Sequence, residues 1–154
     1  MRRMNCKEIL KLSIFMLITG LFACNPERQP IAYGQDKCEF CRMSIVDQRF
    51  ACEIVTTKGK ALKFDAVECM VNYIDEHIED EAKIKLFLTN TFDNPGQLAD
   101  ATLCIYLKSE NMPSPMGMNI NPFESTDKAI EMQKQNTGTL MDWNALRADF
   151  VKYK

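Results

Sequence analysis

The sulfur-bearing side chains are the residues of this sequence best suited to chemistry. The chain of 154 residues has seven cysteines and ten methionines but a single histidine. Cys38, Cys41 and Met43 lie close together in the segment CEFCRM. Thiolate and thioether sulfurs are soft donors, which favour Cu(I) over hard cations. The types and spacing of these three residues therefore predict a site for a soft metal ion.

A loop rich in methionine offers further sulfur ligands. Met112, Met116 and Met118 are interspersed with Pro113 and Pro115, which stiffen the backbone. A methionine at helical spacing is usually a core residue, but this loop has no apolar periodicity. We interpret it as a second part of the metal site or as a surface that contacts a partner.

Other uses of the thiols stay open. Cys38 and Cys41 could form a disulfide or a thioredoxin-like redox pair, although no predicted strand precedes them. A structural zinc site needs four ligands, so two of Cys52, Cys69 and Cys104 would have to join the first two. These three occupy apolar positions of predicted strands and a helix, which is more typical of small core residues.

Composition excludes several classes of protein. The net charge of −2 argues against a general nucleic-acid binder, which would carry a basic excess. The lone His77 excludes catalytic zinc sites built on two histidines. There is no glycine-rich phosphate loop and no hydrolase signature, so we expect a protein that is not an enzyme.

The N-terminus has the features of a bacterial lipoprotein signal. Residues 1–23 begin with basic side chains and continue into an apolar run that is shorter than the ~20 residues of a membrane span. Cys24 follows the small residue Ala23, so we expect cleavage before Cys24 and attachment of lipid to its sulfur. We expect residues 24–35 to form a tether and residues 36–154 to form the folded domain, held on the membrane and facing the periplasm.

Two stretches of alternating and helical periodicity indicate the elements that must position these residues. In the first half, about 36–95, we predict strands at 50–57 and 61–64, a helix at 66–79 and a strand at 84–89. Asp65 is the expected N-cap of that helix, with Glu68 completing a capping box. In the second half, about 96–154, we predict strands at 103–107, 118–123 and 139–141, a helix from Ser125 or Thr126 to 135, and a helix at 143–153. The pattern predicts an α+β fold with two related halves.

The motifs together resemble the NosL family. The resemblance rests on the segment 38–47, on the run Lys63-Phe64-Asp65-x-x-x-Cys69-Met70, and on Met112-Pro113-x-Pro115-Met116-Gly117. It implies a lipid-anchored accessory factor that passes Cu(I) to nitrous oxide reductase, working with an ABC-type membrane complex. It also implies a fold of two ββαβ units, as in organomercurial lyase.

The resemblance suggests which sulfur atoms bind the metal. Cys41 and Met43 match the Cys-Gly-Met core of the family, although Arg42 stands in place of the glycine. Cys38 matches a cysteine that some members have, and Met116 is the expected distant ligand, with Met112 and Met118 in reserve. The alternatives from other classes are an envelope thiol–disulfide oxidoreductase using Cys38 and Cys41, and an interaction lipoprotein stabilised by zinc or disulfides.

Overall fold

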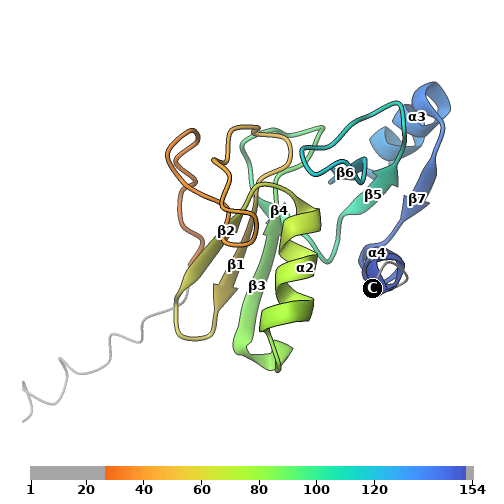
Figure 1. The fold of residues 1–154 in the computed structure, drawn as a ribbon. Coiled ribbons are helices and arrows are strands. Elements are labelled where there is room, and N and C mark those ends of the chain that lie inside the picture. Colours follow the sequence, from red (N-terminus) through yellow and green to blue (C-terminus); the bar gives the residue numbers. More distant parts are fainter. Residues whose placement is uncertain (1–26, 152–154) are drawn as a thin grey trace, which may run out of the picture.

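The computed structural model describes residues 27–151, which fold into two antiparallel sheets and their helices (Figure 1). The first sheet has the order β2-β1-β3-β4 and the second has the order β6-β5-β7. The elements are β1 (Cys52–Thr56), β2 (Ala61–Phe64), α2 (Val67–His77), the 3₁₀ turn η1 (Glu81–Lys83), β3 (Ile84–Thr89), β4 (Ala99–Asp100), β5 (Ile105–Lys108), β6 (Ile120–Phe123), α3 (Thr126–Asn136), β7 (Thr139–Met141) and α4 (Trp143–Val151). The predicted α+β class is confirmed. The expected signal peptide 1–23 and Cys24 lie outside the described residues.

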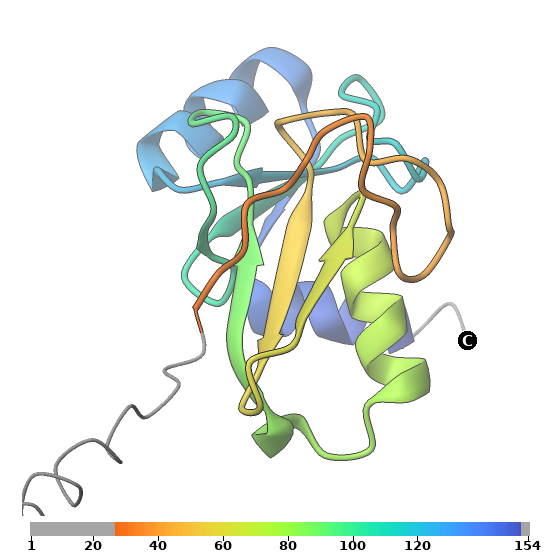
Figure 2. The same ribbon diagram turned by 90° about the vertical axis from the view of Figure 1, so that its left-hand side faces the viewer.

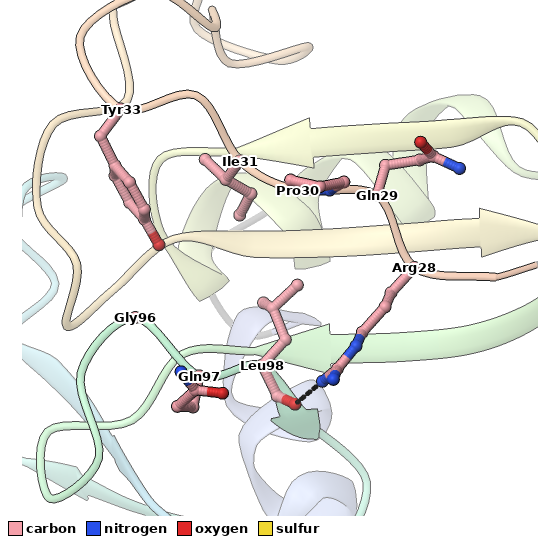
Figure 3. A pocket seen from close by; sticks show the side chains of 8 residues that line it. All are labelled: Arg28, Gln29, Pro30, Ile31, Tyr33, Gly96, Gln97 and Leu98. Atoms are coloured by element: carbon pink, nitrogen blue, oxygen red, sulfur yellow. Dashed lines mark hydrogen bonds between the residues drawn. The ribbon is translucent and has the colours of Figure 1, made fainter.

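The first sheet carries α2 on one face and an irregular segment on the other. Cys52 and Ile54 of β1 are buried in the same core cluster as the apolar residues of α2. The intervening Glu53 is fully buried, because residues 28–34 cross the sheet there (Figure 3). The carboxylate of Glu53 accepts a hydrogen bond from the backbone N–H of Gln29 at 2.8 Å. The C-terminal part of the expected tether is thus bound to the body of the protein.

Helix α4 and the loop before β6 belong to the second half of the chain and pack against the core of the first half (Figure 2). Arg147 of α4 donates hydrogen bonds to Asp75 of α2 at 2.8 Å and to Glu81 of η1 at 2.9 Å. The predicted N-cap of α3 is confirmed, since the hydroxyl of Ser125 accepts from the N–H of Lys128 at 3.3 Å. Within residues 27–151, no helix is long and apolar enough to cross a lipid bilayer.

The predicted capping box at α2 is wrong. The N-cap is Ala66, which makes no side-chain cap, and the helix runs from Val67 to His77. The carboxylate of Asp65 instead accepts a hydrogen bond from the backbone of Val46. The carboxylate of Glu68 accepts a hydrogen bond from the hydroxyl of Ser114. Both acidic side chains are buried, so tertiary contacts have replaced the local capping interaction.

Candidate metal centre

Three cysteines converge at one end of the first sheet. The sulfur atoms of Cys38, Cys41 and Cys69 all lie within 4.8 Å of one another. Cys38 and Cys69 are buried, and Cys41 is half-buried. Among residues 27–151, no histidine or carboxylate joins this group. The arrangement is a compact three-sulfur centre that opens toward solvent at Cys41.

A tight loop positions Cys38 and Cys41. The backbone N–H of Arg42 donates to the carbonyl of Cys38 at 3.0 Å, and the N–H of Cys38 donates to the carbonyl of Met43 at 2.8 Å. Closing this loop places Arg42 at φ 66°, in the left-handed region that glycine adopts without strain. An L-residue there costs about 1–2 kcal/mol, yet the backbone keeps the shape that a Cys-Gly-Met sequence would favour.

Helix α2 brings the third thiol to this loop. Cys69 lies in the first turn of α2, directly after β2 delivers the chain to the same end of the sheet. The loop is fixed to β2 because the N–H of Glu39 donates to the carbonyl of Lys63 at 2.9 Å.

The pKa values of the three thiols are shifted in different directions. Hydrogen bonding from Cys69, together with the backbone of Cys41, lowers the pKa of Cys38 to about 5 despite burial. The same bond to Cys38, with burial, raises the pKa of Cys69 far above its usual range. Burial raises the pKa of Cys41. These opposite directions favour a thiolate at Cys38 that accepts a hydrogen bond from a protonated Cys69.

The other two described cysteines have different surroundings. The thiol of Cys52 lies 3.2 Å from the carbonyl of Phe50 and 3.2 Å from the hydroxyl of Thr89. The thiol of Cys104 lies 3.3 Å from the carbonyl of Asp100, and burial raises the pKa of Cys104 to about 12. Both stay protonated at neutral pH and serve as core residues.

The chain is similar to known proteins both in sequence and in fold. A sequence profile of the NosL family matches residues 31–151. The chain belongs to the NosL family. The crystal structure of the copper chaperone NosL from Shewanella denitrificans has the same fold, with a TM-score of 0.66 and 18% sequence identity. The alignment covers 78% of this chain and 95% of that one. Among curated proteins, none is significantly similar in sequence.

The methionines expected as ligands in this NosL family member have different environments. Met43 is 48% exposed on the loop that carries Cys41. Met116 and Met118 are half-buried and pack against the core cluster that contains Cys38 and Cys69. Met112 is buried in a separate cluster with Leu107, Phe123 and Ala129. Met43 and Met116 remain predicted ligands, with Met112 and Met118 in reserve. Met112 is the one most enclosed by apolar side chains of the second half.

Cys69 was the functional residue that periodicity alone obscured. Its position among apolar residues of a predicted helix made it look like a core side chain. The run Lys63-Phe64-Asp65-x-x-x-Cys69-Met70, which contributes to the NosL resemblance, is the signal that could have identified it.

Proposed function

We propose that this protein is a copper chaperone, which binds one Cu(I) ion at Cys38, Cys41 and Cys69 and transfers it to another protein. The observation that carries the proposal is the close approach of three thiol sulfurs. Thiolates are soft ligands, and three of them suit a monovalent soft ion that accepts a low coordination number. The Shewanella denitrificans protein that shares the fold is a copper chaperone, which supports this function.

The ligand set favours Cu(I) over structural zinc. Structural zinc is almost always held by four protein ligands in a tetrahedron. Among residues 27–151, the group of close metal-binding side chains stops at three cysteines. Within the part of the chain that the structure describes, the remaining soft ligands predicted for this centre are thioethers, which Zn²⁺ binds poorly and Cu(I) binds well.

The exposed side of the centre supports a transfer function without catalysis. Cys41 is half-buried and Met43 on the same loop is exposed, so an incoming ligand can reach the metal from this side. A new ligand then binds before an old one leaves, and Cu(I) is never released as a free ion. No substrate bond is made or broken in this exchange, so the protein need not be an enzyme.

A thiol–disulfide oxidoreductase is the second candidate. The lowered pKa of Cys38 and the short distance to Cys41 favour it. The burial of Cys38 opposes it, because a nucleophilic thiol must reach the disulfide of its substrate. Catalysis of disulfide reduction by the metal-free protein would support this candidate, and its absence would favour copper transfer.

The cellular setting that we propose comes from the sequence. Lipid attachment at Cys24 would hold the protein on the membrane, facing the periplasm of a bacterial cell. The recipient would be nitrous oxide reductase, reached together with an ABC-type membrane complex. Membership of the NosL family and the lipoprotein-signal features of residues 1–23 before Cys24 support this setting.

We also propose that the two halves are related ββαβ units, as in organomercurial lyase. Two features support this relation. The chain order strand, strand, helix, strand occurs in β1-β2-α2-β3 and again in β5-β6-α3-β7. The first strand of each set is central, between the second and the last.

Titration of the reduced protein with Cu(I) tests the proposed function. The full chain, purified in detergent without oxygen, should hold one Cu(I) against a competing chelator. The lowered pKa of Cys38 favours its thiolate at pH 7, and the raised pKa values of Cys41 and Cys69 favour their protonated thiols, so binding to all three should release about two protons. Calorimetry in buffers of different ionisation enthalpy measures this number. Failure to retain Cu(I) would refute the function, and binding without any proton release would mean that Cys41 and Cys69, whose pKa values are raised, are not ligands.

Expression in cells tests the anchor and the recipient together. In bacteria that produce this protein together with a nitrous oxide reductase, Cys24→Ser should move the protein from the membrane to the soluble fraction. The copper content of the purified reductase should fall, because the chaperone is no longer held beside the membrane complex. A reductase with full copper content in cells that lack the whole chain would exclude it as the recipient.

A further inference from the structure

The methionine loop is shared between the two halves of the protein. At its start, Met112 is buried in the core of the second half, and its carbonyl accepts a hydrogen bond from Asn121 at 2.8 Å. Farther along, Met116 and Met118 pack against the core of the first half, which contains Cys38 and Cys69. The loop therefore brings thioethers from the second half to the core on which the thiols lie.

One buried hydrogen bond joins this loop to the helix that carries Cys69. The hydroxyl of Ser114 donates to the carboxylate of Glu68, and both side chains are buried. The same hydroxyl accepts from the backbone N–H of Asn119 at 2.9 Å, which closes the loop around Met116. Glu68 directly precedes Cys69, so the contact fixes the loop beside the first turn of α2.

The burial of Glu68 needs a reason. Its second carboxylate oxygen is buried without a hydrogen-bond partner, and such a group costs free energy that an apolar side chain would not. It does not cap the helix, because the N-cap Ala66 has no side-chain partner. Besides its own backbone N–H, its carboxylate is hydrogen-bonded to the hydroxyl of Ser114 and to the backbone of Ile120. These two partners lie within and just after the methionine loop, which points to the placement of that loop as the role of Glu68.

We propose that Glu68 and Ser114 are positioning residues, which hold Met116 against the three-thiol centre so that its thioether can bind the copper. The inference rests on the proposed function, because it concerns an additional ligand for the same Cu(I). The NosL resemblance already implies Met116 as a ligand, and the inference adds the two residues that hold its loop in place. Glu68 acts through the loop and does not itself touch the metal.

The test compares variants of the full chain in the Cu(I) competition titration. Ser114→Ala should weaken Cu(I) binding about 10- to 100-fold, the range for residues that orient metal ligands. Met116→Ala should weaken it to a similar extent, and the double variant should be no weaker than Met116→Ala alone. Glu68→Gln keeps an oxygen acceptor for Ser114 and should bind within about threefold of the original protein, which also shows that the fold survives substitution here.

A control within the same loop separates positioning from general loosening. Glu110→Gln alters the exposed hydrogen bond between Glu110 and Asn119, and it should leave the affinity unchanged. The methyl NMR signal of Met116 should shift on addition of Cu(I) to the original protein and not to Ser114→Ala.

The possible outcomes are distinct. If the original protein does not retain Cu(I), the proposed function fails and this inference fails with it. If it retains Cu(I) but Ser114→Ala binds equally well, the inference alone is wrong. Additive losses in the double variant, or a large loss in Glu68→Gln, would also overturn it, because the effect would then not pass through the hydrogen bond to Met116.

Discussion

Replacing Cys69 by serine should weaken Cu(I) binding by about 100-fold or more, since loss of a ligand exceeds the effect of losing a residue that only orients one. Serine has nearly the same shape but a hard oxygen, which is a poor donor to a soft ion. Cys69 is also the principal hydrogen-bond partner that lowers the pKa of Cys38. Its loss should therefore raise the pH at which the remaining thiols bind the metal. Competition titrations between pH 6 and pH 8 measure both effects.

Cys104→Ser is the matched control for this substitution. Cys104 is also a buried cysteine, but its thiol contacts the carbonyl of Asp100 and takes no part in the three-sulfur group. Its replacement should leave the Cu(I) affinity within about threefold, although some stability is lost with any buried substitution. Equal losses in the two variants would mean that burial, and not coordination, causes the effect, and Cys69 would no longer be a ligand.

Local sequence patterns predicted most of the elements that build this centre. The hairpin of β1 and β2 follows from alternating residues around Gly59, and α3 begins at Ser125 as its capping chemistry predicts. The 3.6-residue periodicity identified α2 correctly to within two residues at each end. These features depend on neighbours in the sequence, so they can be read without knowledge of the fold.

The features that periodicity missed depend on contacts between distant segments. The Asp65 and Glu68 pair fits a capping box, but their carboxylates bind Val46 and Ser114, which only the folded chain brings near. Likewise, Cys69 has the spacing of a core residue, and its partnership with Cys38 requires the loop to fold back onto α2. In both cases a local rule was overridden by a tertiary contact at the candidate site.

Arg42 gives a third example in which a local rule is broken near the centre. Its left-handed backbone is unfavourable for arginine, and its exposed guanidinium forms an ion pair with Glu39 at 3.2 Å. The N–H of Arg42 donates to the carbonyl of Cys38 and the N–H of Cys38 donates to the carbonyl of Met43, and these two bonds enforce the conformation. Strain of this kind is typical of functional sites, where the surrounding structure over-determines the backbone.

Gly138→Ala should lower the free energy of unfolding by about 3 kcal/mol or more. Gly138 has φ +108°, a conformation that L-residues rarely adopt. A Cβ atom there would lie 2.3 Å from the carbonyl oxygen of Lys108 in β5 and 3.0 Å from the Cβ of Ser109. The first of these neighbours is backbone of the central strand, so the second sheet must shift to relieve the clash. Denaturant unfolding followed by circular dichroism measures the loss.

Gly59→Ala separates the clash from the backbone preference. Gly59 also has a positive φ, +81°, but a Cβ there would meet no atom within 4 Å. This control should lose only about 1 kcal/mol, the cost of the left-handed conformation itself. Because the three thiols lie in the first half, folded Gly138→Ala should still bind Cu(I). Its Cu(I) affinity should fall by no more than the contribution of the Met116 thioether, since Met116 belongs to the second half, which the clash displaces. Equal stability of the two variants would show that the close approach of Gly138 to β5 is not what requires glycine there.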